Sequence, residues 1–237
     1  MALPSPLASG RDAEVFALDE HRVLRRYRYF CDTAPEAAAM EHAAAHGFPV
    51  PEVHRAEGSE LEMERLYGPT MLDASLDGQI TPEEASRVLA ELHERLHALP
   101  PRPGGAGGRL LHMDLHPGNV VLTPKGPVVI DWTNARDGDP DLDLALTALL
   151  LALIGESGPP PLARLAAACL EPYAGHVKGD PTRLVDEVVA LRADDPNLTE
   201  EEVALLPRAA DLVRRARAAR TRPEDGSTEV DAPPARG

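Results

Sequence analysis

The sequence lacks the marks of a disulfide-stabilised protein and of a nucleic-acid-binding protein. Its two cysteines, Cys31 and Cys169, lie far apart and form neither a disulfide framework nor a metal-binding pattern, as is typical of a reducing compartment. Lysine and arginine together number 24 against 39 aspartates and glutamates, which gives a formal net charge of -15. Non-specific nucleic-acid binding depends on basic side chains that neutralise phosphates, so this charge argues against it.

The chain also lacks long hydrophobic runs and targeting segments. The opening MALPSPLASG has neither the basic start nor the apolar stretch of a signal peptide. The longest apolar run, residues 142–154, is interrupted by Asp143 and is shorter than the roughly 20 residues that a membrane-spanning helix needs. We therefore expect a cytoplasmic protein with neither a membrane nor a nucleic acid as partner. The sequence indicates no oligomeric state.

The most informative stretch is residues 111–132, LHMDLHPGNVVLTPKGPVVIDW. His112, Asp114 and Asn119 follow the spacing H-x-D-x-x-x-x-N, and Asp131 ends the second of two apolar runs, VVLT and PVVI. In kinase-type phosphoryl transfer, one Asp accepts the hydroxyl proton, an Asn five residues later binds a metal ion, and an Asp after a strand binds another. The spacing predicts these roles for Asp114, Asn119 and Asp131, with magnesium as the metal and His112 as a scaffold of the loop.

A plain turn is the alternative interpretation, because a Pro-Gly-Asn run between apolar segments is often only a turn. A turn does not predict two strands joined by a Lys-Gly pair and ending at an Asp. We therefore favour the phosphoryl-transfer site.

The sequence HMDLHPGN followed by VVIDW resembles the aminoglycoside phosphotransferase family of small-molecule kinases. The resemblance covers most of residues 9–145 and implies a protein-kinase-like two-lobe fold with a small β-rich N-lobe and a larger helical C-lobe. The Asp-x-His-Pro-Gly-Asn core and the Asp-Trp pair in place of Asp-Phe-Gly distinguish this family from ordinary protein kinases.

The order of expected elements is consistent with an α+β fold, since strands come first and helices follow. Alternation predicts a hairpin within residues 14–28 and two strands within 51–66, and the Ala-rich segment 35–46 predicts a helix. A capping box at Thr81 opens a helix whose apolar face predicts the central buried helix of the larger lobe. Further helices are expected from Asp139 and at residues 160–174, 181–193 and 199–219. We expect lobes at 1–66 and 67–220 and a disordered tail at 221–237.

The resemblance also implies a nucleotide site in which a cation from the third strand pairs the phosphates. The chain has only Lys125 and Lys178, both far downstream, so this cation must be an arginine, and Arg25 fits the position. A guanidinium can pair a phosphate bidentately; the alternative is that Arg25 lies on a solvated edge strand. The resemblance implies Glu36, with Glu41 as the alternative, as the partner of this cation. The remaining nucleotide-binding residues that it implies are Ser9, Gly10, Arg11, Val23, Met63, Glu64, Leu66 and Val121.

Other acidic and histidine residues are expected to have structural roles. The resemblance implies that Asp139 and Asp143 brace the catalytic loop. The pairs His42/His46 and His93/His97 are each one helical turn apart, but neither has an evident third ligand for zinc. We therefore expect these histidines to pack or to lie at the surface.

The sequence thus favours an ATP-dependent phosphotransferase that uses magnesium and acts on a hydroxyl of a small molecule. Acidic residues on the helices after residue 139 favour a cationic acceptor such as an aminoglycoside. Two alternatives stay open: a nucleotide-binding pseudokinase without catalysis, favoured by Arg25 and the sparse phosphate loop, and a compact atypical protein kinase.

Overall fold

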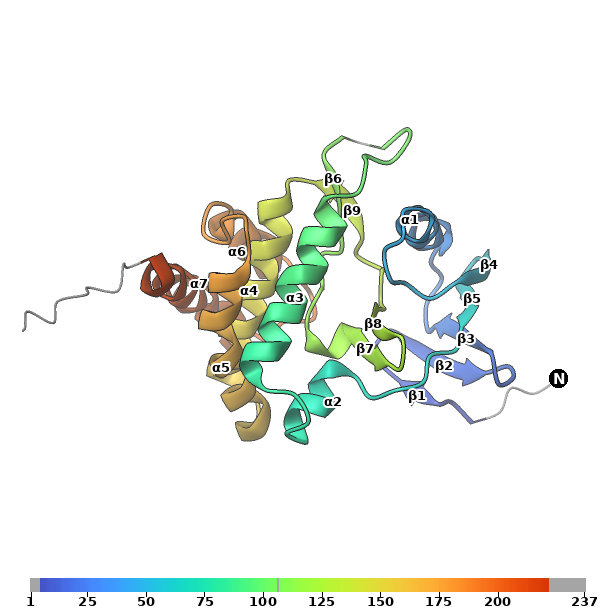
Figure 1. The fold of residues 1–237 in the computed structure, drawn as a ribbon, viewed down its shortest axis with the longest axis horizontal. Coiled ribbons are helices and arrows are strands. Elements are labelled where there is room, and N and C mark those ends of the chain that lie inside the picture. Colours follow the sequence, from blue (N-terminus) through green and yellow to red (C-terminus); the bar gives the residue numbers. More distant parts are fainter. Residues whose placement is uncertain (1–4, 106, 222–237) are drawn as a thin grey trace, which may run out of the picture.

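The computed structural model describes residues 5–105 and 107–221 and has two lobes (Figure 1). A sheet with one helix forms the smaller lobe, and helices form most of the larger one. The α+β two-lobe architecture expected from the sequence is confirmed. The expected tail falls mainly on residues 222–237, which lie outside the described residues.

The smaller lobe is a five-stranded antiparallel sheet in the order β1-β2-β3-β5-β4. Its third strand is central, because β3 pairs with β2 on one side and with β5 on the other. Alternation along a strand puts Val23, Arg25 and Tyr27 on the same face, and all three are buried. The bounds of these elements are β1 (Ala8–Ser9), β2 (Ala13–Ala17), β3 (Arg22–Tyr27), α1 (Ala34–Ala45), β4 (Val53–Glu57) and β5 (Glu60–Glu64).

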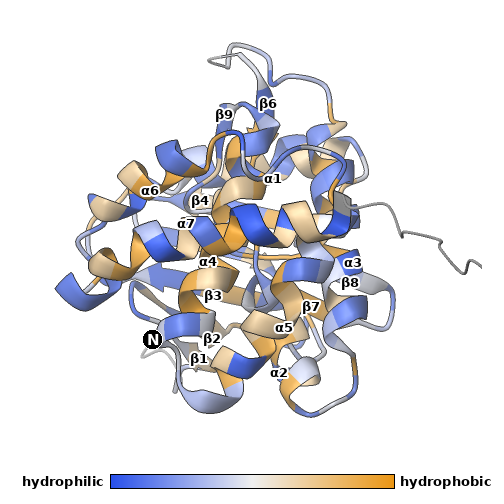
Figure 2. Ribbon diagram, turned by 90° about the vertical axis from the view of Figure 1, so that its left-hand side faces the viewer, coloured by the Kyte–Doolittle hydropathy of each residue, from blue (hydrophilic) through white to orange (hydrophobic). Residues whose placement is uncertain are grey.

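The larger lobe packs its helices around α4, which is buried along most of its length. The helix predicted to be central, α3, instead shows a polar face to solvent, so that prediction was wrong. In Figure 2 the hydrophobic ribbon of α4 lies behind α7, with which it packs. An apolar stripe sufficed to predict that α3 packs on the core, but α4 is apolar all round and needs neighbours on all sides. The helices are α2 (Met71–Leu76), α3 (Pro82–His97), α4 (Pro140–Ser157), α5 (Pro160–His176), α6 (Val185–Ala193) and α7 (Glu200–Thr221).

Short elements between the lobes carry the motif residues. The short strand β6 (Arg109–Leu111) pairs with β9 (Arg136–Gly138), and the two bracket the motif at its start and end. A 3-10 turn, Pro117–Asn119, leads into the hairpin β7 (Val120–Thr123) and β8 (Gly126–Val129). The strands VVLT and PVVI of the sequence therefore form the predicted hairpin, which ends beside Asp131.

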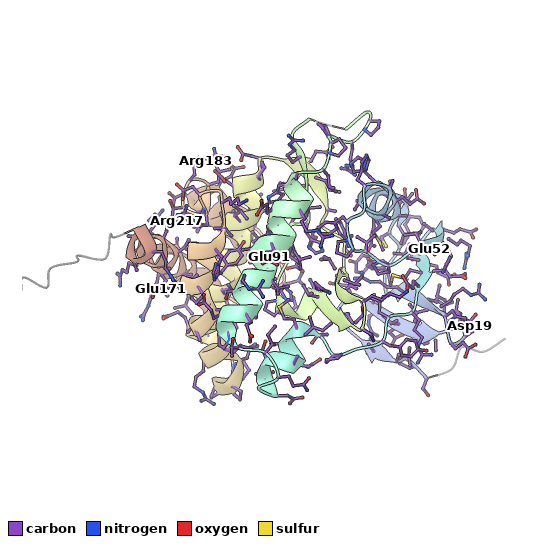
Figure 3. All side chains as sticks on the ribbon, in the orientation of Figure 1. Asp19, Glu52, Glu91, Glu171, Arg183 and Arg217 are labelled. Carbon is purple, nitrogen blue, oxygen red and sulfur yellow. The ribbon has the colours of Figure 1, made fainter. Side chains whose placement is uncertain are left out.

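The outer surface of both lobes carries exposed charged side chains. Figure 3 labels Asp19 and Glu52 on the smaller lobe and Glu91 and Glu171 on the larger, and all four are exposed. No helix in the described parts of the chain combines the length and apolar character needed to cross a bilayer.

Trp132 anchors the segment after the hairpin in the core. Its ring is fully buried and packs edge-on against Phe48, with ring centroids 5.8 Å apart, and against His112, with centroids 4.8 Å apart. Its indole N–H donates to the carbonyl of Val129 at 3.1 Å. Trp132 therefore fixes the backbone on the carboxyl side of Asp131.

We predict that Trp132→Ala lowers the free energy of unfolding by about 3–5 kcal/mol, because it leaves a large cavity and an unpaired carbonyl. The matched control is Phe30→Ala: Phe30 is 90% exposed, and surface changes usually stay within about 0.5 kcal/mol. Urea unfolding followed by circular dichroism measures both variants. Equal losses of stability would contradict the packing described for Trp132.

Candidate active site between the lobes

The loop of the motif, residues 112–119, is held by Asp143, in the first turn of α4. Its carboxylate accepts the backbone N–H of His112 at 2.9 Å and of Met113 at 2.8 Å. Met113 has a φ of 62°, a left-handed conformation that non-glycine residues adopt only when their surroundings enforce it. The two hydrogen bonds supply that constraint and direct the next residue, Asp114, into the space between the lobes.

Asp143 belongs to a buried polar cluster below the loop. His97 lies 3.0 Å from Asp143 through Nε2, and Thr147 donates to the carbonyl of Leu115 at 2.7 Å. Burial by itself would raise the pKa of Asp143, but the hydrogen bond from His97 and the adjacent histidines hold that pKa far below its usual range. Asp143 therefore braces the loop, as expected. The Asp139 carboxylate caps α4 by accepting the N–H of Asp141 and pairs with Arg183.

The histidine pairs show no sign of a zinc site. Within residues 5–105 and 107–221, no group of three or more His, Cys, Asp or Glu side chains could hold a metal ion. His93 contacts Thr147 and the hydroxyl of Tyr173, and His42 contacts the carbonyl of Pro100.

Asp114 and Asn119 lie next to each other at the end of the loop. The Asn119 amide nitrogen donates to the Asp114 carbonyl at 2.9 Å and to its carboxylate at 3.3 Å. This directs the amide oxygen of Asn119 away from Asp114. Burial raises the pKa of Asp114, while the charges of His116, His112 and Arg192 oppose the rise.

Arg25 joins β3, α1 and the segment after β8. Its guanidinium donates to Glu36 at 3.1 Å and to Asp131 at 2.7 Å. The side chain of Arg25 is 11% exposed, and β3 is an inner strand. Arg25 therefore does not lie on a solvated edge strand. Glu36, not the exposed Glu41, is its partner on α1.

Hydrogen bonds extend this ion pair to Tyr27 and Thr133. The Tyr27 hydroxyl donates to Glu36 at 2.6 Å and lies 2.6 Å from the Thr133 hydroxyl, which donates to Asp131 at 2.9 Å. Burial tends to raise the pKa of Asp131, but the charge of Arg25 and the hydrogen bonds from Arg25 and Thr133 lower it overall. For Glu36, burial outweighs Arg25 and the pKa is raised. The two carboxylates that pair with Arg25 therefore have pKa values shifted in opposite directions. Asp131 also has a left-handed backbone, with a φ of 65°.

A cavity of about 790 Å³ lies beneath the sheet and contains most of the residues expected to bind nucleotide. Ser9 does not line it, because its hydroxyl accepts from Arg28 at 2.6 Å. Glu36 also lies outside the lining and reaches the cavity only through Arg25. The expected residues that line the cavity are Gly10, Arg11, Val23, Arg25, Met63, Glu64, Leu66, Val121 and Asp131.

A second cavity, of about 470 Å³, opens on the other side of Arg25 and Asp131. Asp114 lines this cavity and not the first, whereas Asp12, Arg25 and Asp131 line both. The site thus has two compartments that meet at Asp131, with Asp114 on one side only. Asn119 is buried beside Asp114 and lines neither compartment.

Several lining residues had no signal in the sequence. Pro51, Tyr67 and Ile130 line the first cavity, and Arg136, Arg192 and Asn197 line the second. The walls of the second cavity include α6 and the loop after it, which lie more than fifty residues beyond the end of the motif, where no spacing rule applies. Only the packing of α6 against α4 brings them to Asp114.

Asn119 and Asp131 have the donor chemistry of a magnesium site. A carboxylate and an amide oxygen are hard ligands, and magnesium usually takes one or two such protein ligands and completes its shell with phosphate and water. The Asp131 side chain is 36% exposed, which leaves it accessible from the cavities although Arg25 and Thr133 both bind its Oδ1. The residues present therefore fit a magnesium ion.

We predict that Arg25→Met lowers the free energy of unfolding by about 3 kcal/mol, because it leaves Glu36 and Asp131 without a cationic partner. Arg26→Met is the matched control: Arg26 is the next residue on β3, and its pair with Glu60 is partly exposed, so it contributes about 0–1 kcal/mol. Chemical unfolding at pH 7 followed by circular dichroism compares the two. A smaller loss for Arg25→Met than for Arg26→Met would show that the buried bridge does not stabilise the fold.

The buried His93 predicts a dependence of stability on pH. Burial lowers its pKa from 6.5 to about 4, although Asp143 opposes this. The unfolded chain therefore takes up a proton at a higher pH than the folded chain, and stability falls as pH drops from about 7 toward 4. Relative to His93→Gln, the wild type should lose about 1–2 kcal/mol of unfolding free energy between pH 7 and pH 5. Unfolding curves at both pH values test this, and a difference that does not change with pH would contradict it.

A family model matches most of this chain. Residues 4–109 and 76–181 match the model of the phosphotransferase enzyme family, APH. No curated protein matches the chain. The matched ranges overlap and together span more than half of the chain.

Three solved structures show the same fold at low sequence identity. The ADP-bound aminoglycoside phosphotransferase APH(2'')-Ib is 12% identical, with a TM-score of 0.52 over 88% of this chain and 93% of the other. The streptomycin-ATP-APH(2'')-IIa ternary complex is 13% identical, with a TM-score of 0.53 over 90% of this chain and 93% of the other. A choline/ethanolamine kinase family protein from Mesorhizobium loti is 18% identical, with a TM-score of 0.51 over 91% and 87%. The protein-kinase-like fold is thereby confirmed.

Proposed function

Since this chain belongs to the phosphotransferase enzyme family, we propose that it transfers the γ-phosphoryl group of ATP to a hydroxyl group of a small molecule. The observation that carries the proposal is the pair of cavities that meet at Arg25 and Asp131, with Asp114 facing only the second. Nucleotide in the first cavity and acceptor in the second would bring the γ-phosphate and the hydroxyl together at this junction.

The similar structures support the choice of nucleotide. One of them contains ADP and another contains ATP with streptomycin. In this chain, Met63, Glu64 and Leu66 would contact the base and Val23 and Val121 its two faces, while Gly10 and Arg11 would cover the phosphates with Ser9 beside them. In this proposal, the lobe at residues 1–66 covers the nucleotide, and the lobe at residues 67–220 provides the acceptor pocket.

Asp114 is the proposed catalytic base. The acceptor oxygen attacks the γ-phosphorus, the bond from that phosphorus to the bridging oxygen breaks, ADP leaves, and the hydroxyl proton passes to Asp114. The Asn119 amide orients the Asp114 carboxylate, as its hydrogen bond at 3.3 Å indicates. The raised pKa of Asp114 makes it a better proton acceptor than an ordinary Asp once it is ionised.

Asn119 and Asp131 are the proposed magnesium ligands, and Arg25 pairs the nucleotide phosphates. Magnesium would supply positive charge that neutralises the phosphates. Glu36 holds Arg25 in place at the edge of the nucleotide cavity. We place this reaction in the cytoplasm, in line with the expectation from the sequence.

A nucleotide-binding pseudokinase is the second candidate, favoured by one observation. Arg25 donates to Asp131 at 2.7 Å and so engages the carboxylate that would bind magnesium. An inactive protein would keep this ion pair when ATP and magnesium are added. In an active one, Asp131 must also bind the metal, so magnesium should tighten ATP binding.

We predict that Asp114→Asn keeps ATP affinity within about twofold and lowers phosphate transfer by at least about 100-fold, since the amide cannot accept the proton. In the wild type, transfer should decline as pH falls through a pKa above the ordinary Asp value of about 3.9. ADP release measured against a panel of aminoglycosides, amino alcohols, sugars and hydroxy acids tests both statements, and calorimetry with ATP and magnesium gives the affinity. ATP binding without ADP release from any member of the panel would support the pseudokinase.

A further inference from the structure

The acceptor cavity contains arginine side chains that the proposed reaction does not use. Arg192, in the last turn of α6, and Arg136, at the start of β9, both line this cavity together with Asp114. Neither lines the nucleotide cavity. These two arginines can therefore contact a molecule bound in the acceptor cavity but not one bound in the nucleotide cavity.

Arg192 has an unpaired donor in a buried position. Its Nη1 donates to Asp195 at 2.6 Å, but its Nε is buried and has no hydrogen-bond partner among the described residues. Buried donors without an acceptor are uncommon in folded proteins. A guanidinium presents its donors as a planar fork that fits two oxygens of one anionic group. The Arg192 side chain is 25% exposed, and its hydrogen bond to Asp195 uses Nη1. Its other terminal nitrogen can therefore donate to a ligand in the cavity.

Arg136 is also available. It is exposed, and its side chain forms no ion pair or hydrogen bond with residues 5–105 or 107–221. The Asn134 and Asn197 amides line the same cavity and add neutral donors and acceptors.

Two carboxylates of this cavity, Asp195 and Asp131, are already paired with arginines. Asp195 accepts from Arg192 through Oδ2 and from the Asn197 backbone through Oδ1. Asp131 is paired with Arg25, and Asp12 lines both cavities. Arg192 and Arg136 therefore offer cationic donors beside Asp114 in this cavity. A cationic acceptor, as expected from the acidic helices, would meet Asp12 and Asp114 in this cavity.

We propose that the acceptor carries an anionic oxygen group, a carboxylate or a phosphate ester, that binds Arg192 and Arg136 while its hydroxyl faces Asp114. This inference rests on the proposed phosphotransferase function and names the substrate class of the same site.

The test compares acceptors that differ in charge but share a primary hydroxyl. Glycerate represents carboxylates, glycerol 3-phosphate represents phosphate esters, glycerol and glucose are neutral, and ethanolamine and kanamycin are cationic. ADP release gives kcat and KM for each, and mass spectrometry identifies the phosphorylated product. We expect at least one anionic acceptor to have a kcat/KM about tenfold or more above those of the neutral and cationic acceptors. Which anionic acceptor reacts distinguishes a carboxylate from a phosphate ester.

Variants connect this preference to the two arginines. Arg192→Gln and Arg136→Gln should each raise KM for the anionic acceptor by about tenfold, with KM for ATP unchanged. Arg192→Lys keeps the charge without the fork and should give a smaller increase. Arg164→Gln is the matched control, because Arg164 is an exposed residue of α5 that lines neither cavity. Arg136 is exposed, so its variant tests the proposal even if Arg192→Gln unfolds, which melting curves would show.

The outcomes separate this inference from the proposed function. Transfer to neutral or cationic acceptors but to no anionic one would overturn the inference and leave the phosphotransferase in place. Anionic acceptors whose KM responds equally to Arg136→Gln and Arg164→Gln would also overturn it. No ATP binding in any form of the protein would overturn the proposed function, and the inference with it.

Discussion

One buried guanidinium holds the two halves of the site together. Arg25 extends from the central strand of the sheet, pairs with Glu36 on α1 and reaches Asp131, which follows the hairpin of the larger lobe. A buried charge is costly unless it is paired and hydrogen-bonded, so the three side chains constrain one another. Both cavities include Arg25 and Asp131 in their walls, and the shape of the candidate site therefore depends on this bridge.

Strained backbone flanks the motif at both ends. Met113 and Asp131 have φ values of 62° and 65° and are the only non-glycine residues with positive φ in the described ranges. Such conformations cost of the order of 1–3 kcal/mol each and persist where the surroundings over-determine them. Asp143 holds the first with two hydrogen bonds, and Arg25, Thr133 and the buried Trp132 hold the second. The buried network thus maintains the conformation that presents Asp114 and Asp131.

The fold is shared with small-molecule kinases at identities of 12–18%. The two cavities of the candidate site differ in how well their residues can be predicted from sequence patterns. The cavity proposed for the nucleotide is lined by residues of the sheet and of the motif, which can be placed from the sequence pattern. The acceptor side is built from α6 and the following loop, whose Arg192 and Asp195 belong to no motif. For that reason the proposed acceptor rests on the charges and pairing of this chain rather than on its relatives.

The sequence alone determined the elements and the motif. Alternation and capping predicted the hairpin, the Ala-rich helix and the helical second part, and the spacing of Asp114, Asn119 and Asp131 indicated the chemistry, because these features depend on residues close along the chain. Only the tertiary structure decided that Glu36 rather than Glu41 meets Arg25, that Ser9 faces Arg28, that α4 rather than α3 is the central helix, and that α6 brings Arg192 to Asp114. These contacts join distant segments, and their geometry follows from how helices and strands pack rather than from any local pattern.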